Sequence, residues 1–283
     1  MALKHKLGYF FGAACISAIF IVMLVFDRFV QPGVNNSLNP NDFSKSCINQ
    51  QPNKTIDVNG ELTVSVWNIY KQQNEGWAKD LSLLLDNSQL VLLQEASLTK
   101  GLIAVIQRHN KNANMARAFN RLNIVNGVMD LASVQPIRIC SMLAPEPWIR
   151  LAKSALVAEY PLSNGQNLLA INLHSINFSW FLNEYKAQLL PLFDALKAHK
   201  GPIIIAGDFN TWRQARLNLI EELVNELGLK EATPEIDLRS RFLDYPLDHL
   251  YYRDLNLLSA TVTETQSSDH NPMQVKFSLF NHD

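Results

Sequence analysis

The sequence predicts an α/β protein in which two mostly antiparallel sheets pack together and helices cover their outer sides. Strand-like and helix-like segments are mixed along residues 61–283, and several strand-like segments follow one another in the middle of the chain, which favours antiparallel pairing. The sequence contains no glycine-rich loop of the GxGxxG, GxxxxGKS or GxxxxGKT type that would indicate a nucleotide-binding fold. An α/β sandwich fits this order of elements.

Near the N-terminus stands an uncharged run of 20 residues, Leu7 to Phe26. At a rise of about 1.5 Å per residue this run is just long enough to cross the hydrocarbon core of a bilayer, so it predicts an uncleaved membrane helix. A cleaved signal peptide is the alternative, but no convincing small-x-small cleavage site follows. Lys4, His5 and Lys6 precede the run, and the positive-inside rule then sends the rest of the chain across the membrane.

Residues 28–60 are rich in proline and asparagine and show little apolar periodicity. This composition is typical of a tether, and we expect few core contacts from it. The chain therefore divides into a membrane anchor at 1–27, a linker at 28–60 and one domain at 61–283.

The domain starts with apolar residues that alternate with polar ones. Leu62, Val64 and Val66 predict a strand that ends at Asn68. Apolar periodicity places the elements that follow. Helices are expected at 77–85 and 97–109, and strands at 89–94, 127–133, 137–143, 152–160 and 167–174.

The second half of the domain is expected to start with a long helix at 181–199. Its amphipathic face consists of Leu182, Tyr185, Leu189, Leu192 and Leu196. A second helix is expected at 214–227, and strands at 247–252, 259–264 and 272–279.

Between these two helices, Pro202 to Trp212 reads PIIIAGDFNTW. A short apolar run that ends at a glycine predicts a buried strand. Asp208 and Asn210 follow it two residues apart, where a loop held by a rigid strand could direct both side chains at one ligand.

Composition narrows the class of protein. With 283 residues, 47% of them hydrophobic, the chain can bury a large core, so a disordered or fibrous protein is excluded. The net charge of -1 provides no global basic field for non-specific nucleic-acid binding. The nearest approach to a basic cluster, which we interpret as solvated loop residues, is formed by Arg108, Lys111, Arg117 and Arg121.

The three cysteines, Cys15, Cys47 and Cys140, are too few for a disulfide scaffold and lack the spacing of a metal site. A bridge between Cys47 and Cys140 is conceivable in an oxidising compartment, but the sequence favours free thiols.

Polar residues of a narrow type follow the apolar runs. In chain order they are Asn68, Glu95, His174, Asn177, Asp208, Asn210, Asp248, Asp269 and His270. Each alone is more often a turn residue, a helix cap or a satisfied histidine. Together, however, they supply the side chains that metal-assisted hydrolysis of a phosphate ester requires.

The chemistry suggests a role for each type of residue. Mg²⁺ prefers carboxylate oxygens completed by water and substrate phosphate, and Glu95 and Asp269 are the candidate ligands. Phosphoryl oxygens gain charge in the transition state, so neutral donors and protonated imidazoles would stabilise them. The candidates for this stabilisation are Asn68, Asn210, His174 and His270.

Asp208 is the candidate base that takes a proton from the attacking water. Asp248 is expected to orient His270 through its second ring nitrogen. His249 is interpreted as a bystander that points to the opposite face of an extended segment. Lys153 could lie near the site and contact phosphate or lie at a strand edge, and the strand edge is the preferred interpretation.

In this order and spacing, the motifs WN, QE, LH, GDFN and SDH resemble those of the endonuclease/exonuclease/phosphatase superfamily. That superfamily includes deoxyribonuclease I, apurinic endonucleases, neutral sphingomyelinases and inositol polyphosphate phosphatases. The resemblance covers Glu61 to Phe280. VWNIYKQQ, LVLLQEA, RLAKSALV, AGDFN and SDHNP more closely resemble the YafD family of bacterial proteins.

The resemblance implies a four-layered α/β sandwich with one divalent metal ion, Mg²⁺ or alternatively Mn²⁺, at the mouth between the sheets. It implies metal contacts for Glu95, Asp269 and Asn68. It implies catalytic roles for Asn68, His174, Asp208, Asn210, Asp248 and His270, while Asn177 matches less securely.

These observations predict a metal-dependent phosphodiesterase or phosphatase in which an activated water attacks a phosphate ester. The ester could be a lipid head group, another small phosphodiester or a nucleic acid, although a nuclease would call for a Lys/Arg stripe that no continuous run provides. A non-catalytic, membrane-anchored binding protein is the alternative from another class.

Residues 7–26 predict membrane contact, and no protein partner is inferred. We expect a single-pass protein of the bacterial inner membrane with a periplasmic catalytic domain, and a cytoplasmic domain is the alternative.

Overall fold

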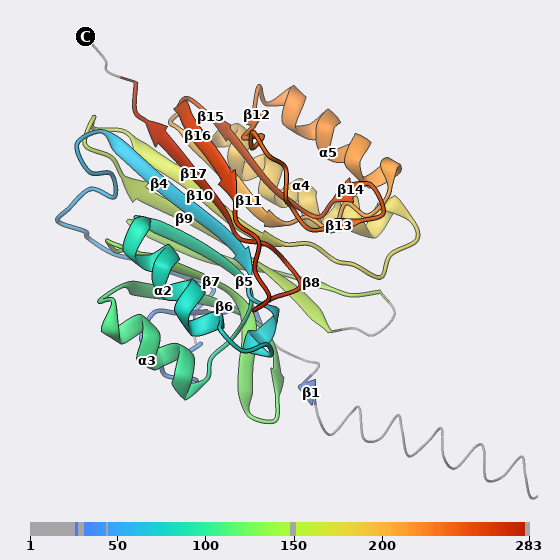
Figure 1. Ribbon diagram of the computed structural model, residues 1–283, viewed down its shortest axis with the longest axis horizontal. Helices are drawn as coiled ribbons and strands as arrows, with labels where there is room; N and C mark the ends of the chain where they lie inside the picture. The colour runs from blue at the N-terminus through green and yellow to red at the C-terminus, as the bar shows by residue number, and fades with distance from the viewer. Residues whose placement is uncertain (1–25, 28–30, 44, 148–150, 281–283) are drawn as a thin grey trace, which may run out of the picture.

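The computed structural model describes residues 26–27, 31–43, 45–147 and 151–280. Two large sheets lie face to face, and helices cover the outer side of each sheet, so that the described chain forms four layers (Figure 1). This arrangement confirms the predicted α/β sandwich.

The first sheet has the strand order β1-β6-β7-β5-β4-β17-β16, with β2 also paired to β6. β4 and β5 are parallel, and the other pairs are antiparallel. Its strands are β1 (Phe26–Asp27), β2 (Val34–Asn35), β4 (Glu61–Asn68), β5 (Leu90–Ser97), β6 (Asn112–Arg121), β7 (Ile124–Ala132), β16 (Asn256–Val262) and β17 (Met273–Ser278).

The second sheet has the order β12-β15-β11-β10-β9-β8-β3, and its one parallel pair is β10 with β11. Its strands are β3 (Cys47–Asn49), β8 (Arg138–Pro145), β9 (Ala152–Pro161), β10 (Asn167–His174), β11 (Ile203–Asp208), β12 (Lys230–Glu231) and β15 (Asp248–Arg253). A separate hairpin pairs β13 (Arg241–Phe242) with β14 (Tyr245–Pro246).

Helices form the two outer layers. α2 (Trp77–Asn87) and α3 (Lys100–Arg108) cover the first sheet, and their buried leucines pack on Val91 and Leu93. α4 (Leu182–Ala198) and α5 (Gln214–Glu226) cover the second sheet. A short 3-10 turn, η1 (Tyr70–Gln72), follows β4.

The predicted strand at Pro202 to Trp212 is β11, and every residue of it is buried. Because side chains alternate between the faces of a strand, Ile203 and Ile205 pack against α4 and α5, while Ile204 and Ala206 fill the core between the sheets. The strand therefore contacts both adjoining layers, as its continuous apolar run predicts.

The other predicted elements lie within a few residues of their observed bounds, but one long strand was missed. β6 reads NANMARAFNR, and its buried side includes the polar Asn114 and small alanines, so the apolar alternation is obscured. The basic cluster is consequently not a solvated loop. Arg117 lies in β6, and its guanidinium stacks over the ring of Phe43 at 5.0 Å.

Few core contacts were expected from residues 28–60, and this expectation is wrong for the described part of that segment. Val34 and Ile56 lie in the core between the sheets, and Phe43 packs in the core beneath α2 and α3. These apolar residues are separated by polar residues and prolines at irregular intervals, so the sequence pattern does not predict that they are buried.

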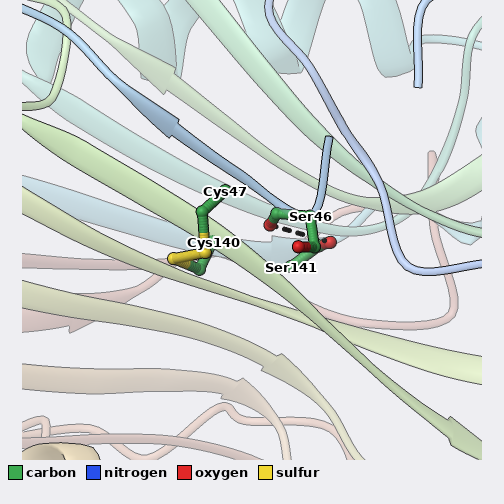
Figure 2. The surroundings of a disulfide bond; sticks show 4 residues. All are labelled: Ser46, Cys47, Cys140 and Ser141. Atoms are coloured by element: carbon green, nitrogen blue, oxygen red, sulfur yellow. Dashed lines mark hydrogen bonds between the residues drawn. A yellow bond between two sulfur atoms is a disulfide. The ribbon is translucent and has the colours of Figure 1, made fainter. Parts of the chain in front are cut away.

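Cys47 and Cys140 form a disulfide, whereas the sequence favoured free thiols. The two residues face each other in the β3–β8 pair, and Figure 2 shows the neighbouring Ser46 and Ser141 joined by hydrogen bonds. The pairing could not be inferred from the sequence because β3 lies in the apparent linker. The disulfide fastens that segment to the second sheet.

The predicted membrane helix at 7–26 lies outside the described residues, apart from Phe26 at the start of β1. Among the described residues, no helix is long and apolar enough to span a bilayer.

A polar cluster interrupts the core between the sheets. Asp130 of β7 accepts a hydrogen bond from Asn172 Nδ2 at 2.8 Å, and Asn172 Oδ1 accepts one from Gln94 Nε2 at 2.7 Å. All three side chains are fully buried. Burial raises the pKa of Asp130 to about 7, and the hydrogen bond from Asn172 opposes this shift only in part.

We predict that breaking the disulfide destabilises the domain. Since the bridge closes a loop of 93 residues, the double variant Cys47→Ala/Cys140→Ala should lose about 2–4 kcal/mol of unfolding free energy, measured by urea denaturation. A reductant should destabilise the wild-type chain and leave the double variant unaffected. Equal stability of the oxidised wild type and the variant would contradict this assignment.

We also predict that Asp130→Asn removes a loss of unfolding free energy that the wild-type chain shows as the pH rises. A pKa raised by folding means that Asp130 contributes stability at low pH that is lost as the pH rises from about 4 towards 7. The unfolding free energy of the variant minus that of the wild type should therefore increase by about 2–3 kcal/mol from about pH 5 to about pH 8. Thermal unfolding at both pH values tests this, with the exposed Asp254→Asn as a control that should show no such improvement.

Candidate active site

The polar residues predicted at strand ends meet at one edge of the sandwich. The parallel pairs β4–β5 and β10–β11 place their carboxyl ends there, and in the strand register His174 pairs with Asp208, which in turn pairs with Asp248. His270 joins them from the segment before β17 and reaches Asp248 and Asp208. The residues brought together are Asn68, Glu95, His174, Asp208, Asn210, Asp248 and His270.

The Asp208 carboxylate lies at the centre of this group and is only 3% exposed. Its Oδ2 accepts a hydrogen bond from Asn68 Nδ2 at 3.0 Å, and its Oδ1 accepts one from the backbone N–H of Asn210 at 2.9 Å. His174 Nε2 lies 3.4 Å and His270 Nε2 lies 4.0 Å from Oδ2. Burial raises the pKa of Asp208 to about 6, against the opposing effect of His270.

His270 is oriented by Asp248, as the sequence predicts. Its Nδ1 lies 2.6 Å from Asp248 Oδ2, and its backbone oxygen accepts a hydrogen bond from Trp67 Nε1 at 2.9 Å. Burial alone would lower the pKa of His270, but the contact with Asp248 outweighs burial and raises it to about 10. The imidazole is therefore a cation whose Nε2 faces Asp208.

Glu95 reaches the site through an irregularity in β5. Its φ is 54°, and the pairing of β5 with β7 shifts register between Leu93 and Ala96. Such a bulge re-aims a side chain relative to a regular strand. Burial would raise the pKa of Glu95, but Lys153 and Lys71 hold it below its usual value.

Two lysines complete the site; sequence reasoning missed Lys71 and preferred the wrong one of two positions for Lys153. Lys153 was assigned to a strand edge, but its Nζ lies 2.7 Å from His174 Nε2 and 3.8 Å from Glu95 Oε1. Lys71 forms an ion pair with Glu95 from η1, whose residues have φ between 49° and 55°. No sequence pattern marks this turn; the only signal for Lys153 was its occurrence in RLAKSALV.

The two imidazoles differ in charge. Burial lowers the pKa of His174 well below its usual value, and Lys153 and Lys71 reinforce this effect. The expectation that both histidines are protonated is therefore not met by His174. A neutral His174 can accept the hydrogen bond that the Lys153 ammonium donates.

The remaining candidates lie around this group. Asn210 has a φ of 50° and donates from Nδ2 to Ser175 O at 3.0 Å. The side chain of Asp269 is exposed, with Ser268 Oγ at 3.4 Å from its Oδ1. His249 was interpreted as a bystander, and its ring indeed contacts Glu231 instead, with Nδ1 2.6 Å from Oε1.

The donor set can be tested for a fit to a metal ion. Among the described residues, no group of three or more His, Cys, Asp or Glu side chains has the arrangement of a metal site. Mg²⁺, however, often takes only one or two carboxylates and completes its shell with water and substrate phosphate. The Glu95 carboxylate, with the Asn68 amide beside Asp208, fits such a site, provided that Lys71 yields its contact with Glu95.

Comparison with known proteins agrees with this geometry. The model of the Endonuclease/Exonuclease/phosphatase family matches residues 65–270, which is well over half of the chain. The chain belongs to this family. Members of the family generally hydrolyse phosphoester bonds and commonly use divalent metal ions.

Curated relatives also match over most of their length. A UPF0294 protein of Vibrio cholerae serotype O1 is 42% identical over 236 residues, which cover 83% of this chain and 84% of the relative. A UPF0294 protein of Vibrio campbellii is 43% identical over 234 residues, covering 82% of this chain and 83% of the relative. These matches confirm the resemblance to YafD-like proteins.

Solved structures share the fold. An endonuclease/exonuclease/phosphatase from Bacteroides vulgatus superposes with a TM-score of 0.62 at 15% identity, covering 78% of this chain and 99% of that one. The catalytic domain of human Nocturnin, solved with a bound sulfate anion, superposes with a TM-score of 0.59 at 15% identity, covering 80% and 97%. At this level of identity the similarity concerns the fold alone.

We predict that Asp248 determines the charge of His270. In the wild-type chain the imidazole should remain protonated at neutral pH, whereas in Asp248→Asn the effect of burial should dominate and the pKa of His270 should fall by several units. NMR titration of labelled histidines measures both values. Asp86→Asn, which removes the carboxylate beside His109, should leave His270 unchanged. An unaltered His270 titration in Asp248→Asn would contradict the pairing.

Proposed function

We propose that the chain is a metal-dependent phosphoric ester hydrolase, most simply a phosphodiesterase. The observation that carries this proposal is the environment of Asp208: a buried carboxylate held by Asn68 and Asn210, with a pKa near neutrality and a cationic His270 facing it. A base whose pKa lies near the working pH is the most effective at proton transfer.

In the proposed reaction, Asp208 accepts a proton from a water molecule as the water oxygen attacks phosphorus. A new P–O bond forms, the ester P–O bond breaks, and the leaving oxygen takes a proton from solvent water to become an alcohol. Asp208 then releases its proton to solvent. Asn68 and the Asn210 backbone hold the Asp208 carboxylate in one orientation, which fixes the direction of attack.

The cationic groups around Asp208 suit the charge that develops on the phosphoryl oxygens. His270 is held in its protonated form by Asp248, and the ammonium groups of Lys71 and Lys153 lie on the side of Glu95. Because His270 and Lys153 are already in place and largely shielded from water, their stabilisation requires little reorganisation during the reaction, whereas Lys71 must give up its contact with Glu95 when a metal ion binds there.

Glu95 is the residue proposed to hold Mg²⁺ or Mn²⁺, with Asn68 close by. A bound divalent ion would offset the negative charge of the phosphate oxygens. Asp269, the second ligand that the sequence predicts, has an exposed side chain and stays a proposed ligand.

We also propose that the domain works in an oxidising compartment, the bacterial periplasm. The Cys47–Cys140 disulfide supports this location, because structural disulfides persist outside the reducing cytosol. The apolar run at 7–26, proposed as a single membrane anchor, supports it as well.

Hydrolysis of bis(p-nitrophenyl) phosphate by the purified chain tests the proposal. Turnover that requires Mg²⁺ or Mn²⁺ and stops with EDTA is the expected result. If the chain binds metal but hydrolyses no artificial diester, lipid, DNA or RNA, the hydrolase is refuted and a non-catalytic binding protein is the remaining alternative.

Two isosteric variants distinguish the proposed base from the proposed ligand. Asp208→Asn should lower kcat by at least about two orders of magnitude while the metal dependence stays the same, because the variant loses a proton acceptor. Glu95→Gln should instead raise the metal concentration needed for half-maximal rate. Near-normal turnover of Asp208→Asn would mean that another group activates the water, and an unchanged metal dependence of Glu95→Gln would refute its role as ligand.

A further inference from the structure

An apolar pocket with a volume of about 660 Å³ adjoins the candidate active site. We call it the aromatic pocket. It lies between the loop that precedes α4 and the β13–β14 hairpin, which are neighbours in Figure 1. Its walls include Phe178, Trp180, Asn210, Trp212, Phe242 and Leu247. Because Asn210 belongs both to this wall and to the group around Asp208, a ligand in the pocket would extend directly from the reacting phosphate.

Several polar atoms in the walls are engaged within the protein. Trp212 Nε1 donates to the Asn177 carbonyl at 3.3 Å, and Asn210 Nδ2 donates to the Ser175 carbonyl. Ser179 Oγ is hydrogen-bonded to other protein atoms. The walls therefore present mainly ring edges and faces, which suit a hydrocarbon better than a group that needs hydrogen-bond partners.

Two buried charges hold the loop that forms one wall. The Glu146 carboxylate accepts hydrogen bonds from the backbone N–H groups of Asn177 and Phe178, at 2.6 Å and 2.9 Å. The Arg216 guanidinium donates to the carbonyls of Asn177 and Ser179, at 2.9 Å and 3.0 Å. Both charged side chains are buried, so these charge-assisted hydrogen bonds hold the loop in one conformation.

The rim of the pocket exposes large apolar side chains to solvent. Their exposed fractions lie between 54% and 77%. They are Phe178, Trp180 and Phe242 of the lining, and Phe181 and Leu243, which adjoin them in the sequence. Exposed large apolar side chains around a pocket often mark a place where another apolar surface binds.

The charges and ring geometry at the rim disfavour a nucleic acid. Arg213 donates to the Trp180 carbonyl, and Arg241 pairs with Asp237, so both guanidinium groups already have partners within the protein. The rings of Trp180 and Trp212 meet at 86°, and those of Trp212 and Phe242 at 78°, which leaves no parallel pair to sandwich a base.

We infer that the aromatic pocket binds the hydrocarbon chain of a lipid phosphate ester whose phosphate lies beside Asn210 and Asp208. The position of the phosphate rests on the proposed function, whereas the affinity of the pocket for a hydrocarbon chain can be tested without turnover.

A series of alkyl p-nitrophenyl phosphates tests the inference, because the leaving group stays constant while the chain grows from methyl through butyl to octyl. The full-length chain is kept in amphipol and each ester below its micellar concentration. We expect kcat/KM for the octyl ester to exceed that for the methyl ester about ten-fold or more, mainly through KM, since each methylene buried in the pocket leaves water.

The double variant Trp180→Ala/Phe242→Ala should lower the octyl-to-methyl ratio about five-fold or more. Both side chains are mostly exposed, so their removal should not unfold the domain. Leu258→Ala removes a comparably exposed apolar side chain from β16 and should leave the ratio unchanged. An octyl-to-methyl ratio near one in the wild type, or a higher kcat/KM for thymidine 5′-(p-nitrophenyl) phosphate than for the octyl ester, would overturn the inference.

Binding of phosphonates, which cannot be hydrolysed, separates this inference from the proposed function. Octylphosphonate should bind about ten-fold or more tightly than methylphosphonate, as followed by tryptophan fluorescence, and the double variant should lose this preference. Tight octylphosphonate binding without turnover of any ester would refute the hydrolase and retain the pocket. Equal binding of the two phosphonates would refute the pocket even if the esters are hydrolysed.

Discussion

Burial of the Asp208 carboxylate is the constraint on which the rest of the candidate site depends. A carboxylate removed from water is costly unless hydrogen bonds and an opposite charge compensate it. Here the compensation comes from Asn68 of the first sheet, from the Asn210 backbone and from His270. Because these groups belong to different layers, the site is complete only when the two sheets have packed against each other.

Much of this site follows from the sequence because it is tied to strand ends. β11 is an apolar run that stops at a glycine, so the position of Asp208 could be predicted from periodicity alone, and the other motif residues end or flank their own strands. Lys153 could not be placed in the same way. Its direction depends on how β9 packs beside β10, and a lysine at that point in a strand is equally compatible with solvent.

The other sequence predictions that were wrong share one cause, which is contact between parts of the chain that are far apart in the sequence. Val34, Phe43 and Ile56 are buried by elements far away in the chain, and β6 owes its burial to its neighbours rather than to its own composition. Glu95 adopts a left-handed backbone conformation that its residue type does not favour, and Asn210 adopts the same conformation, which asparagine tolerates better than most residues. Such conformations persist where the surrounding structure determines them, and they often occur at functional sites.

The disulfide between β3 and β8 has a consequence for the behaviour of the protein in solution. Without β3, residues 138–140 of β8 would become an edge of the second sheet, with backbone N–H and C=O groups available to a strand of another molecule. β3 has only three residues and is too short to hold that position firmly through hydrogen bonds alone. The covalent bond to Cys140 keeps it in place and so protects this part of the edge against pairing with other chains.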